Sequence, residues 1–287
     1  MRLLVTADLH FNHTRSGPLA RELIKQMNDT GGDVLLVAGD TATSAGDALE
    51  RCLSLFEFDG PRLFVAGNHE LWSRGADSLP IFQDELPRRI RGLGWQWLQG
   101  DPFVRDDIAI VGSIGWYDYA FAVPELGIPQ RFYEHKLSPG AGARLPEFSH
   151  LFDRDDDIPD AAREIVARWN DGRFVRLHRS DSDFLNELLD ELRAGLLSVP
   201  RARHVVCAIH HVPFEQLLPP RHGAQWDFAR AYLGSPRIGA LLREFESVRT
   251  VVCGHSHFAA ETRIGSIRAI NIGSGYRSKT FRSIEIG

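Results

Sequence analysis

Short apolar runs alternate with amphipathic segments in the first quarter of the chain. The apolar runs cover residues 2–6, 34–38 and 62–66, and the segments 18–28 and 46–56 carry apolar residues at helical spacing. This alternation is typical of βαβ units, whose right-handed crossovers place parallel strands side by side. We therefore expect three parallel strands whose carboxyl ends share one edge of a sheet, which is where open α/β sheets bind ligands.

Later apolar runs indicate a second group of strands. Turn residues without helical segments separate the last three runs, which predicts an antiparallel hairpin group that packs as a second sheet on the first. The segments 181–197 and 237–246 have helical periodicity and polar flanks, so we expect them to cover a sheet. Together the pattern predicts an α/β fold of two packed mixed sheets flanked by helices, an αββα sandwich. The later runs are 108–114, 204–209, 249–253, 267–272 and 281–286.

The pattern changes between residues 116 and 173, which are rich in proline, glycine, aromatic and acidic residues. We interpret this region as an insertion, or cap, over the site edge of a single domain that spans residues 1–287. One helix is expected at about 160–169. Gly140 and Gly142, close to Pro139 and Pro146, predict a loop.

Composition narrows the class of protein. The chain has 287 residues, 43% of them hydrophobic, and a formal net charge of -5, so it has no broad positive field for extended nucleic acid. Cys52, Cys207 and Cys253 are widely spaced, which favours reduced core cysteines. No run approaches the roughly 18 apolar residues of a membrane helix, and no charged-then-apolar leader opens the chain. We expect a cytoplasmic protein without a membrane partner.

Potential metal ligands follow five of the predicted strands. Taken singly, each of these sequences is typical of a turn or a helix cap. Five in order, each after an apolar run, favour a metal site instead, and imidazole, carboxylate and amide groups without thiolate suit Mn, Fe, Zn or Co. The sequences are Asp8-Leu9-His10, Gly39-Asp40, Gly67-Asn68-His69-Glu70, His210-His211 and Gly254-His255-Ser256-His257.

This ordered set resembles the signature of the calcineurin-like metallophosphoesterase superfamily, which reads D-x-H, G-D, G-N-H-E/D, H and G-H-x-H. The resemblance implies two divalent or mixed-valence metal ions, held about 3.5 to 4 Å apart by a bridging carboxylate, with a shared hydroxide that attacks phosphorus. It implies that Asp8, His10, Asp40 and His257 bind the first metal. Asp40 as the bridge, Asn68, His210 and His255 would bind the second.

Other residues are candidates for roles around the metals. The resemblance implies that His69 stabilises the transition state and protonates the leaving oxygen; the alternative is a histidine that caps a loop. For the ligand after residue 209 we prefer His210, although a His-x-Pro interpretation would favour His211. The predicted substrate rim is His13, Trp116 and Tyr117, against the alternatives of an exposed loop histidine and aromatics buried in the insertion. Arg74, Arg221 and His222 are conceivable phosphate contacts or solvated surface residues.

The segment after Asp40 distinguishes the possible activities. The protein-phosphatase branch carries G-D-x-V-D-R-G, whereas Thr41-Ala42-Thr43 follows Asp40 here. The nuclease branch brings further C-terminal segments, whereas this chain ends soon after its last predicted strand. We therefore predict a phosphodiesterase that acts on small phosphate esters through the metal-bridging hydroxide. A phosphomonoesterase or nucleotidase is the alternative, and a nuclease or a metal-poor binding scaffold ranks behind it.

Overall fold

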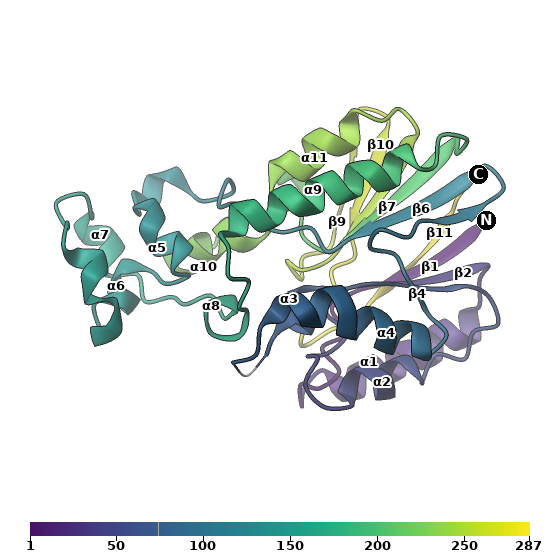
Figure 1. Cartoon of the computed structure of the whole chain (residues 1–287), viewed down its shortest axis with the longest axis horizontal. Helices are drawn as coiled ribbons and strands as arrows, with labels where there is room; N and C mark the ends of the chain where they lie inside the picture. Colours follow the sequence, from purple (N-terminus) through teal and green to yellow (C-terminus); the bar gives the residue numbers. More distant parts are fainter. Residues whose placement is uncertain (74) are drawn as a thin grey trace.

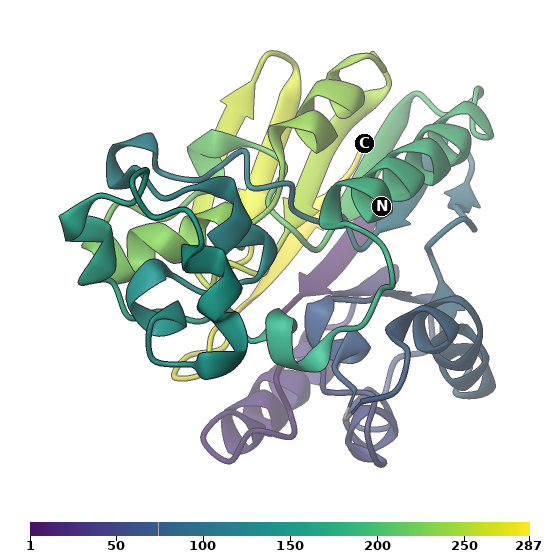
Figure 2. The ribbon, with the colours of Figure 1, turned by 60° about the vertical axis from the view of Figure 1, so that its left-hand side comes forward.

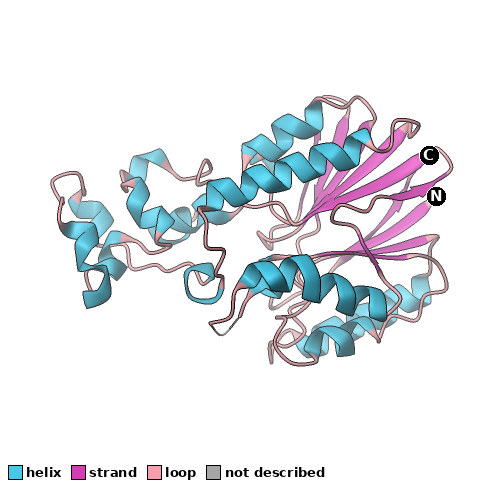
Figure 3. Cartoon of the chain, in the orientation of Figure 1, coloured by secondary structure: helices cyan, strands magenta, loops and turns pink. Residues whose placement is uncertain are grey.

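Two mixed sheets form the centre of the protein in a computed structural model that describes residues 1–73 and 75–287 (Figure 1). The first sheet, in spatial order, consists of β11 (Phe281–Glu285), β1 (Arg2–Thr6), β2 (Val34–Ala38), β3 (Arg62–Val65) and β4 (Gln96–Trp97). The second consists of β5 (Phe103–Arg105), β6 (Ile108–Ser113), β7 (His204–Ile209), β8 (Val248–Cys253), β10 (Ile267–Asn271) and β9 (Ala260–Ile264). The predicted fold of two sheets flanked by helices is confirmed (Figure 3).

The strands that precede the candidate ligands run in one direction. β1 to β4 are mutually parallel, as are β6, β7, β8 and β10, while β5, β9 and β11 are antiparallel to their neighbours. The expected parallel trio is therefore confirmed. The predicted antiparallel group is wrong in two respects. The strand β9 lies between β8 and β10 in sequence, and β8 and β10 pair with each other in parallel. The last strand, β11, pairs with β1 of the first sheet.

Alternate residues of each strand pack between the two sheets, and the others face the helices. Leu36 of β2 and Val206 of β7 belong to the cluster between the sheets, whereas Leu35 and Cys207 belong to the cluster under the helices. Burial on both faces explains why these strands are continuous apolar runs. Cys52, Cys207 and Cys253 are free and buried, as predicted.

Helices cover the outer face of each sheet (Figure 1). Against the second sheet lie α9 (Asp181–Leu197) and α11 (Pro236–Arg243), close to the predicted ranges. None of the described helices combines the length and apolar character that crossing a membrane requires. The first sheet is covered by α1 (Gly17–Thr30), α2 (Ala48–Leu53), α3 (Ser78–Pro80), the π-helical η2 (Ile81–Glu85) and α4 (Leu86–Gly92).

Short helices lie beyond the carboxyl ends of the strands, and Figure 2 brings this group forward. The predicted helix at 160–169 ends early, because Ala167 forms hydrogen bonds with Ser138 instead of continuing the helix. The backbone N–H of Ser138 donates to the carbonyl of Ala167 (2.9 Å), and the N–H of Ala167 donates to Oγ of Ser138 (2.8 Å). The loop predicted around Gly140 is a helical turn that begins at Pro139, a residue well suited to a first helical position. The helices are α5 (Gln130–Glu134), α6 (Pro139–Gly142), α7 (Asp160–Arg163), α8 (Asp171–Phe174) and α10 (Ala224–Ala229), with 3-10 turns η3 (Pro124–Leu126), η4 (Pro146–Phe152), η5 (Glu215–Leu217) and η6 (Arg230–Tyr232).

The packing between the sheets should dominate stability. Leu36 is fully buried there (0% exposed), whereas Leu197 is 63% exposed at the end of α9. We expect Leu36→Ala to lower the free energy of unfolding by about 2–5 kcal/mol, because it leaves a cavity. The matched Leu197→Ala should change it by less than about 0.5 kcal/mol. Urea unfolding measures both, and equal small losses would contradict the proposed core.

Candidate metal centre

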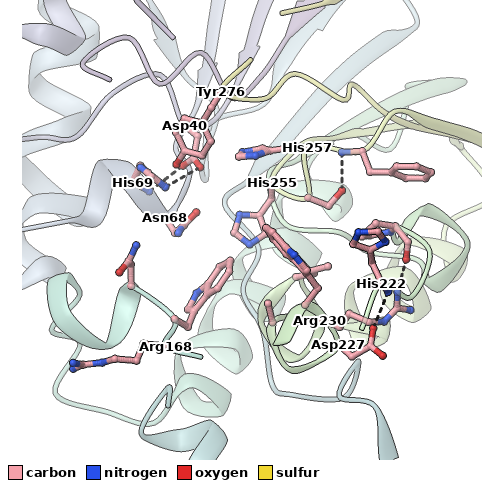
Figure 4. A pocket seen from close by; sticks show the side chains of 18 of the residues that line it. Asp40, Asn68, His69, Arg168, His222, Asp227, Arg230, His255, His257 and Tyr276 are labelled. Atoms are coloured by element: carbon pink, nitrogen blue, oxygen red, sulfur yellow. Dashed lines mark hydrogen bonds and ion pairs between the residues drawn. The ribbon is translucent and has the colours of Figure 1, made fainter. Parts of the chain in front are cut away.

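The predicted ligands converge at the carboxyl edge of the two sheets, around the carboxylate of Asp40. Figure 4 shows four of them, Asp40, Asn68, His255 and His257. Within each of three groups, the ligand atoms lie within 4.8 Å of one another. All of the predicted ligands are buried except His257, whose side chain is 27% exposed. The groups are Asp8 with His10 and His257, His10 with Asp40 and His69, and Asp40 with His210 and His255.

The backbone turns sharply at most of these residues. Five of the seven predicted ligands have left-handed backbone angles, with φ of 42° to 66°. Asp and His adopt this region more readily than most residues, but it still carries strain and persists only where the surroundings enforce it. These turns lie in the loops whose side-chain ligand atoms approach to within 4.8 Å of one another. The five residues are Asp8, His10, Asp40, His255 and His257.

The buried carboxylate of Glu70 enforces one of these turns. It accepts hydrogen bonds from the backbone N–H groups of Asp40 (3.0 Å), Thr41 (2.6 Å), Ala42 (3.1 Å) and Gly67 (2.7 Å). The side chain therefore joins the loop after β2 to the loop after β3. The sequence places Glu70 in the motif, but only the structure shows that it braces the Asp40 loop.

Glycine is required where two loops touch. A Cβ atom on Gly67 would lie 2.2 Å from Oδ1 of Asp40 and 2.7 Å from Nε2 of His210, and one on Gly254 would lie 2.4 Å from Oδ2 of Asp8. None of these three distances is compatible with a side chain at either glycine. The glycines of the G-N-H-E and G-H-x-H sequences therefore leave room for candidate ligands from neighbouring loops.

Backbone carbonyls orient two of the buried histidines, His210 and His255. Nδ1 of His210 lies 3.0 Å from the Ala38 carbonyl, and Nε2 of His255 lies 3.1 Å from the Tyr232 carbonyl. When each nitrogen donates to its carbonyl, the other nitrogens, Nε2 of His210 and Nδ1 of His255, face each other at 3.2 Å. Such carbonyl contacts are the usual way in which metal-binding histidines are held.

The Asp40 carboxylate and burial shift the pKa values of the histidines in this cluster in opposite directions. Burial lowers the pKa of His210, but the nearby Asp40 carboxylate outweighs burial and raises that pKa to about 9. Burial and neighbouring histidines hold the pKa of His255 well below its usual range. On the other side of Asp40, Nε2 of His10 and Nε2 of His257 are only 2.9 Å apart. Paired nitrogens beside a buried carboxylate fit bound cations.

Asn68 provides an independent test of this fit. Its Nδ2 donates to Oδ1 of Asp171 at 2.8 Å, whereas its buried Oδ1 has no hydrogen-bond partner among the described residues. A buried amide oxygen without a partner costs free energy, which a cation ligand would recover. The residues present therefore fit divalent metal ions.

His69 and Tyr276 lie over the cluster. The backbone N–H of His69 donates to Oδ1 of Asp40 (2.9 Å), its ring stacks on Trp72 with centroids 3.7 Å apart, and its Nε2 lies 3.8 Å from Oδ2 of Asp40. Burial lowers the pKa of His69. Tyr276, which sequence reasoning missed, stacks on His10 at 4.4 Å. It follows a strand and a glycine, which is the signal that marks the other loops of the site.

The structure separates His210 from His211. His211 is outside the three ligand groups, packs against the ring of His255 with centroids 4.2 Å apart, and lies 2.9 Å from the Ile114 carbonyl through Nδ1. Burial lowers the pKa of His211 to about 3. The geometry thus brings His210 to Asp40 and leaves His211 in the surrounding packing.

The predicted rim is wrong for two aromatic residues. Trp116 and Tyr117 are fully buried, because the indole N–H donates to Asp181 and the phenol to Asp171 inside the protein. His13 is exposed, and its ring centroid lies 4.8 Å from that of Tyr276.

The three conceivable phosphate contacts have different positions. Arg221 forms ion pairs with Glu125 and Asp227. His222 lines the pocket beside the cluster, and Arg74 lies outside the described residues.

A cavity of about 540 Å³ opens beside the candidate ligands (Figure 4). Asp40, His69 and Tyr276 line it on one side, while the insertion contributes Trp169. Trp226 of α10, which is 69% exposed, also lines the cavity. The space far exceeds that of a phosphate group, so it accommodates an organic substituent.

Comparisons with known proteins agree with this geometry. The profile of the calcineurin-like phosphoesterase family matches residues 1–259. The fold resembles a phosphopantetheinyl hydrolase from Mycobacterium tuberculosis, with a TM-score of 0.69 and 19% identity over 98% of this chain and 95% of that one. A dimetal phosphatase from Danio rerio gives a TM-score of 0.51 and 16% identity over 97% and 88% of the two chains. No curated protein matches this sequence.

The brace formed by Glu70 is testable. Glu70→Gln places an NH₂ group against two of the backbone donors, so we expect a loss of about 1–3 kcal/mol in the free energy of unfolding and weaker metal binding through Asp40. The exposed Glu57→Gln serves as the matched control and should change neither quantity. Urea unfolding and Mn²⁺ titration provide the measurements; unchanged metal affinity in Glu70→Gln would refute this role.

Proposed function

The chain belongs to the calcineurin-like phosphoesterase family, and we propose that it is a two-metal phosphodiesterase of small phosphate esters. The family makes it a hydrolase of phosphate esters that uses divalent metal ions. The single observation that carries the finer proposal is the convergence of two ligand groups on opposite sides of the Asp40 carboxylate.

In this proposal Asp40 is the ligand common to both ions. Its Oδ2 lies 3.8 Å from Nε2 of His10, and its Oδ1 lies 3.4 Å from Nε2 of His210. A carboxylate offers one oxygen to each side, as two-metal sites require. We assign Asp8, His10, Asp40 and His257 to one ion, and Asp40, Asn68, His210 and His255 to the other.

When bound, the two ions would supply Lewis acidity and a hydrolytic nucleophile at neutral pH. The chain itself would supply the group that faces the leaving oxygen. His69 suits this role because two contacts fix its ring at the pocket wall. The ring stacks on Trp72, and the backbone N–H of His69 donates a hydrogen bond to Asp40. From there it would donate a proton to the departing alkoxide.

The charges around the pocket support a diester in preference to a monoester. A phosphomonoester carries nearly two negative charges at neutral pH, whereas a diester carries one. The only arginines among the described lining residues, Arg168 and Arg230, are drawn on the opposite side of the pocket from Asp40 (Figure 4). Apolar residues such as Leu233 and Phe258 complete the wall. This lining suits an organic substituent better than a second charge next to the metals.

Metal removal and substrate choice test the activity. Protein stripped with a chelator should hydrolyse bis(p-nitrophenyl) phosphate at background rate, and Mn²⁺, Fe²⁺, Zn²⁺ or Co²⁺ should restore turnover. We expect kcat/KM for this diester to exceed that for p-nitrophenyl phosphate. A higher value for the monoester would replace the diesterase with a phosphomonoesterase, and no turnover of either ester by the metal-loaded protein would refute the proposed function.

Two substitutions separate metal binding from proton transfer. His69→Asn should reduce kcat by about 10²- to 10⁴-fold while the bound metal stays unchanged, because His69 is not a proposed ligand. Asp40→Asn should lose both turnover and metal, since the bridging oxygen is replaced by NH₂. Elemental analysis beside the ester assay distinguishes them. Wild-type turnover of His69→Asn at saturating metal would eliminate the role given to His69.

A further inference from the structure

Asp171, at the start of α8, is a fully buried carboxylate in the insertion. It forms no ion pair within the described part of the chain. Instead it accepts four hydrogen bonds from uncharged side chains. The donors are Nδ2 of Asn68 (2.8 Å) and Nε1 of Trp72 (2.6 Å) to Oδ1, and Nε1 of Trp169 (2.8 Å) and the hydroxyl of Tyr117 (3.0 Å) to Oδ2.

Burying this carboxylate without a cation costs free energy, which suggests that the carboxylate has a specific role. A buried carboxylate without a cation loses its hydration and recovers that loss only through good hydrogen bonds. Apolar packing would attach the insertion to the sheets without this cost. Two of the four donors, Asn68 and Trp72, belong to the loop after β3, which also carries His69. The carboxylate therefore connects the insertion directly to the candidate metal centre.

The effect on Asn68 follows from hydrogen-bond chemistry. A carboxylate only accepts, so it selects the amide orientation in which Nδ2 faces Asp171. The oxygen then points the other way, and this Oδ1 is the buried atom that has no partner among the described residues. Turning the amide by 180° would present NH₂, which cannot bind a cation, to the same position.

The effect on Trp72 is indirect. Its indole N–H is held by Oδ1 of Asp171, and its ring stacks on His69 with an interplanar angle of 23°. The carboxylate thus also fixes the position of the indole ring on which the imidazole of His69 stacks.

We propose that Asp171 is a positioning residue, which sets the orientation of the Asn68 amide and the place of Trp72, so that the insertion determines one of the two metal sites. This inference rests on the proposed function in one respect, the use of Asn68 as a ligand. It adds a role for the insertion, whose residues otherwise supply only the pocket wall.

Asp181 offers a matched control. It is also a buried carboxylate, at the start of α9, and it accepts hydrogen bonds from Trp116, Tyr119 and Lys136. It has no hydrogen bond to Asn68 or Trp72 among the described residues. Substitution of either aspartate disturbs a comparable buried network, but only Asp171 adjoins a proposed ligand.

The test is a Mn²⁺ titration of metal-free wild type, Asp171→Ala, Asp171→Asn and Asp181→Ala by calorimetry, with the Co²⁺ absorption spectrum as a second readout. We expect Asp171→Ala to weaken one of two binding steps by about 10- to 100-fold, as loss of an outer-shell partner does. The other step should stay within about threefold. Asp171→Asn keeps one acceptor oxygen for Asn68, so its loss should be smaller. Asp181→Ala should bind both ions as wild type does.

Each outcome bears on the proposal. Wild-type affinity in both steps for Asp171→Ala, or an equal selective loss in Asp181→Ala, would overturn it. If Asp171→Ala does not fold, Asp171→Asn must still bind one ion more weakly than Asp181→Asn does. The titration needs no substrate. Wild type that binds two ions but hydrolyses no ester would therefore end the proposed function and still test the role of Asp171.

Discussion

The carboxylate of Asp40 is the group around which the rest of the site is arranged. It is almost fully buried, and imidazoles from three separate loops, His10, His69 and His210, approach its two oxygens to between 3.4 and 3.8 Å. A negative charge in such a place is tolerated only when positive charge or hydrogen-bond donors surround it. The cluster is therefore arranged to hold cations, and the remaining features of the fold serve to keep it assembled.

The fold meets this requirement with strained backbone conformations at the ends of its strands. Parallel strands deliver their carboxyl ends to one edge, and left-handed residues there turn the side chains inward. The hydrogen bonds of Glu70 and the close approach at Gly67 keep those turns in place. A rigid scaffold with strained, well-braced loops is the arrangement expected of a preorganised metal site.

Much of this was predictable from sequence, because the ligands follow directly after continuous apolar strands. Asp8 and Asp40 illustrate this, since local pattern alone places them at strand ends on one edge. What could not be predicted depends on contacts distant in sequence. Trp116 and Tyr117 are buried because partners 65 and 54 residues away, respectively, accept their hydrogen bonds, and Asp171 reaches Asn68 across 103 residues. Likewise β11 pairs with β1 from the other end of the chain.

The insertion thereby contributes more than a wall over the pocket. Through Asp171 it reaches the loop that carries a proposed ligand. If Asp171 positions Asn68 as we propose, sequence changes in this region would alter metal binding as well as the fit of the substrate. Anomalous diffraction from crystals of the protein soaked in Mn²⁺ tests whether Asp40 bridges two metal ions. We predict two peaks about 3.5 to 4 Å apart, one on each side of the Asp40 carboxylate. A single peak, or peaks that do not adjoin Asp40, would contradict a bridging role for Asp40.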